Sequence, residues 1–341
     1  MTEYKNISVI CPIYNEEKHI ERFLDTVLMQ DYPVEHTEVL LLDGMSTDRT
    51  RELIGRYIRQ YSHIRLLDNP QKIVPFALNK GIRAAKGDIV IRLDAHCEYP
   101  NNYFSRLVEE LQRLKADNVG GICYTLPAND SAEAHAVAIG SSHPFGVGSS
   151  IFRIGTNRIM EVDTVPFGCY WRKTFDEIGY FDEELTRNQD DEFNGRLINH
   201  GGKIYIIPDV VINYTARDSF DKMRQMYYQY GLFKPMVNRK LGSPATIRQF
   251  VPALFICGLV VGLVISLLYP PFWYVYLGVL AVYLLTALLT GCYYAVKRRK
   301  PALLLLMPYT FLNIHFSYGL GYLTGIARLW SKKNINVNYN R

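Results

Sequence analysis

The chain has 341 residues and a formal net charge of +5, with 38 Lys and Arg against 33 Asp and Glu. Every acidic residue lies at or before Asp221, whereas 14 basic residues and no acid follow it. Because this basic part is interleaved with long apolar runs, it favours an anionic lipid surface as partner and argues against nucleic acid. The six cysteines form no C-x-x-C pair, which excludes a disulfide framework or a cysteine-based metal cluster and is typical of a reducing cytosol.

Strands and helices alternate in the first hundred residues. A buried strand is predicted over 7–12, an amphipathic helix over 20–28, a second strand over 38–43, a helix over 79–85 and a third strand over 89–91. This alternation is typical of a mostly parallel sheet with crossover helices. The second strand ends in Asp43, and an acidic residue at this place commonly contacts a nucleotide. The glycine-rich dinucleotide fingerprint and the Walker P-loop are both missing, which argues against NAD or hydrolysed ATP.

The third strand continues into Asp94–Ala95–His96. In extended backbone, residues i and i+2 point to the same side, so Asp94 and His96 could converge on one divalent ion. Such an ion could hold a pyrophosphate and neutralise its charge as it leaves. Alone, the tripeptide is also compatible with a capped surface loop. A later segment rich in small residues, 131–150, is compatible either with a mobile flap or with an irregular loop.

Four ordered motifs carry a family resemblance. They are SVICPIYNEE, LLLDGMSTDRT, ALNKGIRAAKGDIVIRLDAH and RNQDDEFNGRL. Together they resemble family 2 glycosyltransferases of the GT-A fold. The Asp-Ala-His variant and segments 143–153, 162–185 and 187–192 resemble the succinoglycan-type glucosyltransferase branch. The resemblance runs from about Ile7 to Gly231 and implies an α/β fold with a mixed, mostly parallel sheet, flanking helices and a C-terminal transmembrane hairpin.

The resemblance implies a nucleotide-sugar side of the site. Pro12, Tyr14 and Glu16 would line the base pocket, with Asp43 accepting a hydrogen bond from the uracil or ribose edge. Asn79 and Lys80 are expected on the same side. Asp94 and His96 would hold Mg²⁺ or Mn²⁺ on the diphosphate. Arg217 could balance the diphosphate, although a helix cap or a surface ion pair explains it equally well.

The resemblance also implies an acceptor side. Asp190 would match the second residue of the Glu-Asp motif and act as general base, although Gln189 stands where the family has Glu. Trp171, Arg187, Asp191 and Glu192 are expected on the acceptor side, and the last two remain rivals for the base. Without the other motifs, the acidic residues at 190–192 would indicate only the solvent-exposed start of a helix, where the helix dipole favours negative charge. The processive-synthase signature Gln-x-x-Arg-Trp is absent, which predicts one sugar added per encounter.

Two uncharged apolar runs, 250–269 and 272–296, are each long enough to cross a bilayer of about 30 Å. The basic run 297–300 marks the cytoplasmic side, so the spans would form a hairpin and the catalytic part would be cytoplasmic. For the third apolar stretch we favour a re-entrant or interfacial segment over a third crossing. No signal peptide is expected before residue 7.

These patterns predict a catalytic domain over 1–235, with a nucleotide half to about residue 96 and an acceptor half beyond. A juxtamembrane linker (236–249), two transmembrane helices (250–296), the third segment (301–327) and a basic tail (328–341) would follow. The expected activity is an inverting, metal-dependent transfer of one hexose from a UDP-sugar to a lipid-linked saccharide in surface or exopolysaccharide synthesis, at the inner membrane. The alternatives are a polyprenyl-phosphate glycosyltransferase and a non-catalytic membrane assembly subunit. Intact Asp43, Asp94, His96 and Asp190 argue against the last.

Overall fold

The computed structural model describes residues 4–244 and 246–331. The chain forms two compact units, and each consists of two stretches of sequence. The first unit contains residues up to 124 together with 151–214, and the second contains 125–150 together with the chain from 215 onward. All predicted site residues except Arg217 belong to the first unit.

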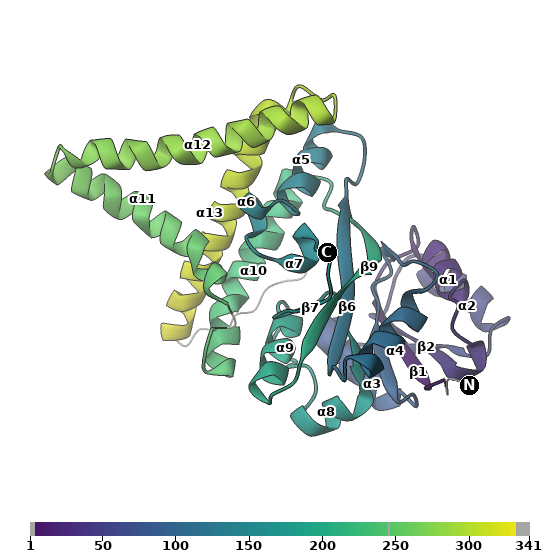
Figure 1. Ribbon diagram of the computed structural model, residues 1–341. Coiled ribbons are helices and arrows are strands. Elements are labelled where there is room, and N and C mark those ends of the chain that lie inside the picture. The colour runs from purple at the N-terminus through teal and green to yellow at the C-terminus, as the bar shows by residue number, and fades with distance from the viewer. Residues whose placement is uncertain (1–3, 245, 332–341) are drawn as a thin grey trace. The chain divides into compact units, whose positions relative to one another are not determined.

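A nine-stranded mixed sheet forms the first unit (Figure 1). Its first four strands, in the spatial order β3-β2-β1-β4, are parallel: β3 (Ile64–Asp68), β2 (Thr37–Asp43), β1 (Ile7–Ile13) and β4 (Ile89–Arg92). The order continues through β8 (Cys169–Trp171), β6 (Asn118–Leu126), β9 (Ile204–Thr215) and β5 (Cys97–Glu98), and β7 (Met160–Glu161) pairs with β9. Strands β4 and β8, β6 and β8, and β5 and β9 pair antiparallel. The mixed α/β sheet predicted from the sequence is therefore confirmed, with its first four strands forming a continuous parallel run.

The alternation of strand side chains places helices on both faces of the sheet. Val9 and Cys11 on β1 belong to a core with side chains of α1 (Ile20–Leu28), α2 (Thr50–Ile58) and α4 (Tyr103–Arg113). Ile10, which points the other way, packs with side chains of α3 (Val74–Ala84), α8 (Arg172–Ile178) and α9 (Gln189–Asn199). Helix α3 lies so close to the sheet that a Cβ on Gly81 would be 2.6 Å from Ile10 Cγ2. Buried residues alternate in direction along β1, as a strand covered on both faces requires.

The strand register determines where the functional loops meet. Ile10 of β1 is opposite Arg92 of β4, and Ile13 is opposite Asp43 of β2. Since these three strands are parallel, the loops that follow them leave from one edge of the sheet. Ligands bind at this edge in open α/β sheets.

The second unit is helical. It contains α5 (Ala132–Gly140), α6 (Pro144–Val147), α10 (Phe220–Leu241), a 3-10 turn over Ile247–Phe250, α11 (Val251–Leu268), α12 (Phe272–Lys297) and α13 (Leu303–Trp330), while the short α7 (Ile151–Ile154) opens the return to the first unit. Segment 131–150 is therefore largely helical rather than irregular, and α5 packs against α13 through Gly140 and Thr310.

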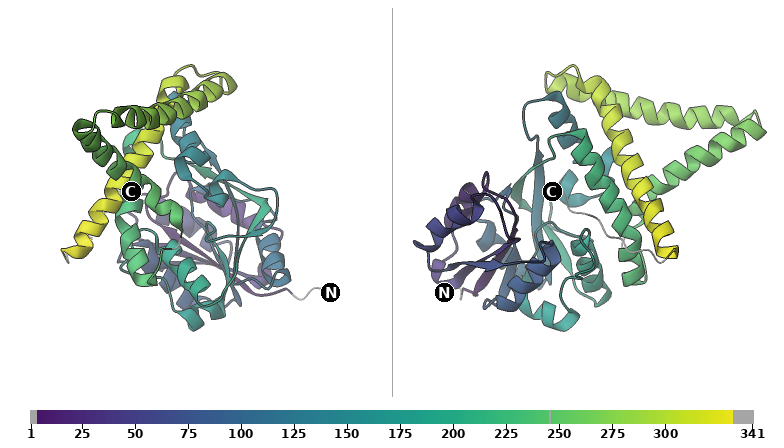
Figure 2. Two further views of the ribbon diagram at one scale, coloured as in Figure 1. Left: turned by 60° about the vertical axis from the view of Figure 1, so that its left-hand side comes forward. Right: turned by 180° about the vertical axis from the view of Figure 1, so that it is seen from behind.

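Three helices among residues 4–244 and 246–331 are long and apolar enough to cross a membrane: Ile247–Leu268, Phe272–Lys297 and Leu303–Trp330. The first two cover the predicted hairpin, and the aromatic turn between them forms its tip (Figure 2). The third covers the stretch for which the sequence left two alternatives. It is one continuous helix of 28 residues, so the chain does not reverse its direction within this stretch as a re-entrant segment would.

Helices α10 and α13 run side by side in the same direction (Figure 1, Figure 2). Phe220 packs on Tyr309 near their first turns, with ring centroids 4.8 Å apart. Further along, a Cβ on Gly321 would overlap the carbonyl oxygen of Tyr228, and one on Gly325 would overlap that of Leu232. The backbones therefore touch, which only glycine permits.

This contact predicts the effect of a larger side chain. Gly321→Leu would push α10 and α13 apart, and overpacking of this kind typically costs about 1–3 kcal/mol or more. The matched control is Gly278→Leu on α12, because a Cβ at Gly278 meets nothing within 4 Å. Thermal unfolding in detergent should show a lower midpoint for the first variant and little change for the second. Equal midpoints would contradict the close packing of these two helices.

Candidate functional site

The loop after β1 carries three of the predicted nucleotide-side residues. Pro12 lies in β1 opposite Leu42 and is buried, Tyr14 is half-buried, and Glu16 is buried. Lys72 Nζ lies 5.8 Å from the centre of the Tyr14 ring. The tyrosine ring therefore forms part of a surface that also carries a cation.

Hydrogen bonds tie this loop to the loop after β2. The amide of Asn15 donates to Ser46 Oγ (2.9 Å), and the amide of Thr47 donates to Asn15 Oδ1 (2.9 Å). The amide of Glu16 donates to Thr50 Oγ1 (2.8 Å). Asn15 and Met45 adopt positive φ values of 54° and 62°, an uncommon conformation that a tightly constrained loop can maintain. The motifs were visible in the sequence, but their mutual bonding was not.

Asp43 is buried completely, and its carboxylate already has partners. Its oxygens accept hydrogen bonds from Ser46 N (3.2 Å) and Ser46 Oγ (2.5 Å) and form an ion pair with Arg51 Nη1 (2.5 Å). Arg51 also contacts Asp68 Oδ1 at 2.8 Å. A uracil or ribose edge would therefore meet Arg51 before it could reach Asp43, and no motif in the sequence predicted the place of this arginine.

Asn79 and Lys80 lie on α3. Asn79 is buried, and its amide nitrogen donates to Phe181 O (2.8 Å) and Glu183 Oε1 (2.9 Å), while its oxygen accepts from Phe181 N. This arrangement attaches the segment before α9 to α3, so the structure gives Asn79 a scaffolding role rather than the predicted nucleotide contact. Lys80 is exposed, and its Nζ donates to Asp68 O at 2.6 Å.

Asp94 and His96 leave β4 through a turn, not in the extended backbone expected from the sequence. The amide of Cys97 donates a hydrogen bond to Asp94 O (3.3 Å). The amide of Asp94 donates one to the Tyr99 hydroxyl (2.8 Å), which also stabilises the turn. His96 Nδ1 lies 3.7 Å from Glu16 Oε1. The turn therefore places the imidazole near Glu16 of the β1 loop, and the predicted convergence of Asp94 and His96 on one ion stays a prediction.

The side chains of Asp94 and His96 fit a divalent cation that is bound by the protein and a ligand together. Residues 4–244 and 246–331 contain no group of three or more His, Cys, Asp and Glu that could hold a metal ion. Asp94 and His96 supply one carboxylate and one imidazole, both partly exposed. Mg²⁺ typically takes one or two protein ligands and completes its shell with water and substrate phosphates. The two residues are therefore compatible with a metal that arrives with a diphosphate.

Arg92 was not singled out in the sequence, yet it lies at the centre of the site. It is the last residue of β4 and is 9% exposed. Its Nη2 lies 3.7 Å from Asp94 Oδ1 and its Nη1 lies 3.9 Å from Asp190 Oδ2. The sequence did contain a signal for this role, namely an arginine at the end of an otherwise apolar strand. A charge that is buried there requires partners.

Asp190 lies in the first turn of α9, which begins after Asn188 in a left-handed conformation (φ 61°). Removal from water, and next the Asp191 carboxylate, raise the pKa of Asp190, while the Arg92 guanidinium acts against both. A raised pKa is characteristic of a carboxylate that accepts a proton near neutral pH. Asp191 is half-buried beside it, and Arg187 is half-buried in the segment before the helix.

Two acceptor-side predictions need correction. Glu192 is buried and forms a bidentate ion pair with Arg196, with both N–O distances 2.9 Å, so it stabilises α9. Trp171 is opposite Ile89, at the amino end of β4, whereas Asp94 follows the carboxyl end. Its indole donates to Ala116 O at 3.1 Å. Both residues are therefore structural. Arg217 belongs to the second unit and stays a prediction.

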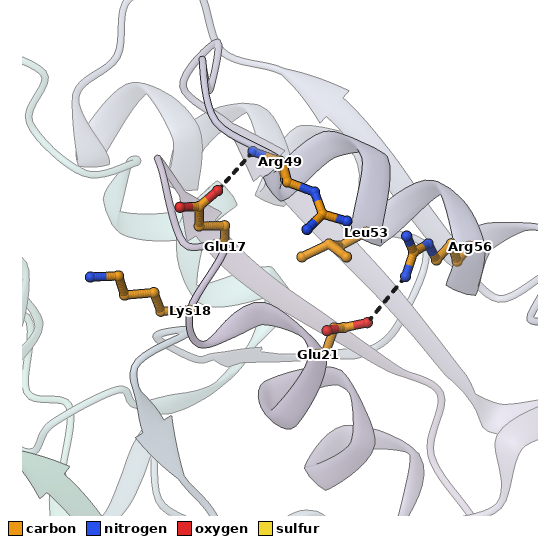
Figure 3. A pocket seen from close by; sticks show the side chains of 6 residues that line it. All are labelled: Glu17, Lys18, Glu21, Arg49, Leu53 and Arg56. Carbon is orange, nitrogen blue, oxygen red and sulfur yellow. Dashed lines mark hydrogen bonds and ion pairs between the residues drawn. The ribbon is translucent and has the colours of Figure 1, made fainter.

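A hollow of about 440 Å³ lies on the α1–α2 side (Figure 3). Glu17, Lys18, Glu21, Arg49, Leu53 and Arg56 line it. The guanidinium groups of Arg49 and Arg56 both pair with Glu52, at 3.1 and 2.7 Å, and Arg56 also lies 3.7 Å from Glu21. None of the predicted site residues lines this hollow.

Comparisons with known proteins show the family of the chain. The sequence model of glycosyl transferase family 2 matches residues 8–172. A Methanococcus voltae protein named dolichyl N-acetyl-alpha-D-glucosaminyl phosphate 3-beta-D-2,3-diacetamido-2,3-dideoxy-beta-D-glucuronosyltransferase is 30% identical over 330 residues, which are 94% of this chain and 97% of that protein. The succinoglycan biosynthesis protein ExoA of Rhizobium meliloti is 28% identical over 253 residues, 72% of this chain and 73% of that protein.

Solved structures show the fold independently. A mannosyltransferase from Pyrobaculum calidifontis, in complex with GDP-Man and Mn²⁺, has a TM-score of 0.60 and 19% identity, with 97% of this chain and 89% of that chain covered. The predicted GT-A fold is thereby confirmed, as is the resemblance found in the motifs. The chain is a glycosyltransferase and belongs to glycosyl transferase family 2.

Proposed function

We propose that this enzyme is an inverting, metal-dependent glycosyltransferase that moves one hexose from a UDP-sugar to a lipid-linked saccharide for surface or exopolysaccharide synthesis. One observation carries the proposal. Asp94 after β4 and Asp190 at the start of α9 lie on two sides of the same buried arginine, at 3.7 and 3.9 Å from it. These distances support a leaving-group site next to a proton-accepting carboxylate.

The donor side is built from the joined β1 and β2 loops. Tyr14, Glu16 and Arg51 present the groups that would contact the nucleoside, with Asp43 orienting Arg51 from beneath. Asp94 and His96 would hold Mg²⁺ or Mn²⁺ on the diphosphate. When bound, that cation neutralises charge that develops on the departing nucleoside diphosphate.

Asp190 acts on the acceptor. Its carboxylate takes the proton of the attacking hydroxyl while the bond from the sugar carbon to the diphosphate oxygen breaks. A positioned base contributes about 10²–10⁴-fold to such a step. One carboxylate is sufficient for a single displacement, which inverts the anomeric configuration, whereas a double displacement requires a second carboxylate as nucleophile.

The names of the relatives support a lipid-linked acceptor. The M. voltae protein is named for a dolichyl-linked N-acetylglucosamine phosphate, and the R. meliloti protein for succinoglycan biosynthesis. The first name describes a lipid that already carries a sugar, which favours a lipid-linked saccharide over a bare polyprenyl phosphate as the acceptor of this chain.

A donor and acceptor panel tests the function. Purified protein in detergent with Mn²⁺ is given UDP-, GDP- and dTDP-sugars, with a lipid-linked saccharide, with polyprenyl phosphate, or without acceptor. We expect nucleotide release from one UDP-sugar that depends on the lipid-linked saccharide and stops with EDTA. Release that requires only polyprenyl phosphate would favour the alternative acceptor, and a preference for GDP-sugars would contradict the donor class.

We also propose that the α11–α12 hairpin inserts into the membrane while α13 lies at its surface. Val260 and Leu268 on α11 are among many exposed apolar side chains of the hairpin. Helix α13 instead packs along α10, which is not among the helices apolar enough to span. Lys222 and Arg224 of α10 are 60% exposed, and charged side chains are costly in hydrocarbon.

Cysteine labelling tests this arrangement. Cys257 and Cys292 are the exposed cysteines of the described chain and would first be replaced by Ser. Tyr269→Cys at the hairpin tip should then react with a membrane-impermeant maleimide in intact cells. The matched variant Arg298→Cys, at the other end of α12, should react only after the membrane is opened. The opposite pattern would reverse the orientation, and reaction of both in intact cells would contradict a cytoplasmic basic run.

A further inference from the structure

We propose that Arg92 is the positioning residue of this active site, a fixed cation that holds the general-base carboxylate and the metal-binding carboxylate in place relative to each other. The proposal rests on the proposed function, because it takes Asp190 as the base and Asp94 as a metal ligand. It adds a residue to which neither the motifs nor the relatives' names assign a role.

The backbone of Arg92 is held from both neighbouring strands. Arg92 is opposite Ile10 in the parallel ladder with β1, and its amide donates to Gly168 O at 3.1 Å. The guanidinium lies 5.7 Å from the centre of the Phe167 ring, a residue with a positive φ of 54°. Strand, turn and ring thus restrict the position of the charge.

The contacts of this guanidinium differ from those of a structural arginine. Arg196 shows the structural pattern, since it donates to Ile178 O, to Tyr180 O (2.7 Å) and twice to Glu192. Among the residues that the structure describes, Arg92 Nε is buried and has no hydrogen-bond partner. Both of its ion-pair contacts exceed hydrogen-bond length. A buried cation whose N–H groups lack hydrogen-bond acceptors lowers the stability of the fold. We therefore take Arg92 to be retained for a function when the substrates occupy the site.

The charge of Arg92 acts on the base. In the described part of the chain, Asp190 interacts electrostatically with Asp191 on its own helix, Arg92 on β4 and the buried Tyr170 on β8. Burial and Asp191 raise the pKa of Asp190, and Arg92 is the cation that counters them. Without Arg92, a larger fraction of Asp190 would be protonated at neutral pH and unable to accept the acceptor's proton.

The test compares Arg92→Met and Arg92→Lys with the wild-type enzyme in the full chain. The control is Arg172→Met, the same change at the amino end of the β4–β8 pair, where the side chain is 43% exposed. We expect Arg92→Met to lower kcat at pH 7 by up to about tenfold for each unit by which the pKa of Asp190 rises, since one unit of pKa changes the ionised fraction by at most tenfold. The donor KM should stay within about threefold, and the deficit should shrink as pH rises because Asp190 then ionises. Arg92→Lys should recover most of the activity, and Arg172→Met should resemble wild type.

Three results would overturn the proposal: a loss that is the same at every pH, a loss confined to the donor KM, or a lowered unfolding midpoint without rescue by Lys. Asp190→Asn separates this proposal from the proposed function. If Asp190→Asn is inactive at every pH while Arg92→Met behaves as wild type, the base assignment stands and the role of Arg92 is wrong. If Asp190→Asn remains active, the base assignment itself has failed.

Discussion

Asp190→Asn should lower turnover by at least about a hundredfold while leaving donor affinity nearly unchanged. The substitution keeps the shape of the side chain and removes its capacity to take a proton. Because Asp190 acts on the acceptor hydroxyl in the transition state, its loss should appear in kcat rather than in the binding of the nucleotide sugar. Steady-state kinetics with the lipid-linked acceptor and calorimetry with UDP measure the two quantities separately.

Asp191→Asn is the matched control for this variant. Adjacent residues of a helix point about 100° apart, so Asp190 and Asp191 cannot both face Arg92 squarely. The ion pair with Arg92 is formed by Asp190. We therefore expect Asp191→Asn to cost much less turnover. The reverse order of the two variants would identify Asp191 as the base and shift the motif register by one residue.

Asp94→Ala should abolish both activity and metal-dependent binding of UDP. The substitution removes the carboxylate of the predicted pair, and His96 alone is a weak site for a hard cation that prefers oxygen ligands. His96→Ala should weaken Mn²⁺ affinity in the presence of UDP without changing the unfolding midpoint greatly, because the side chain is partly exposed. Calorimetric titration of Mn²⁺ with UDP measures both effects.

Asp88→Ala provides the control, because Asp88 is exposed at the amino end of the same strand. It should bind Mn²⁺ and UDP as the wild type does. Unchanged Mn²⁺ affinity in the double variant of Asp94 and His96 would remove these residues from the metal site, even if activity were lost.

Hydrophobic patterning predicted three of the first four strands of the sheet well. The alternating and continuous apolar runs of β1, β2 and β4 place their observed bounds within a residue or two of those expected. Strands β5, β7 and β8 have two or three residues each, too few to show a period, and their pairing depends on distant partners. The pairing of these three short strands was therefore not visible in any local pattern of the sequence.

The same limit explains the errors in the site. Trp171 was expected near the acceptor, but its position follows from the register of β8 against β4, which no local pattern reveals. Glu192 was different, because Arg196 follows it by four residues and such pairs commonly meet on a helix. The sequence thus held the signal for the scaffolding role of Glu192.

The stereochemical course of transfer tests the central claim most directly. The enzyme is given its UDP-sugar and lipid-linked acceptor, and the anomeric configuration of the new linkage is read by NMR against that of the donor. A single displacement with Asp190 as the only reacting carboxylate predicts an inverted configuration. Retention would require a second protein nucleophile at the sugar carbon and would contradict the proposed roles of Asp190, Asp94 and Arg92 together.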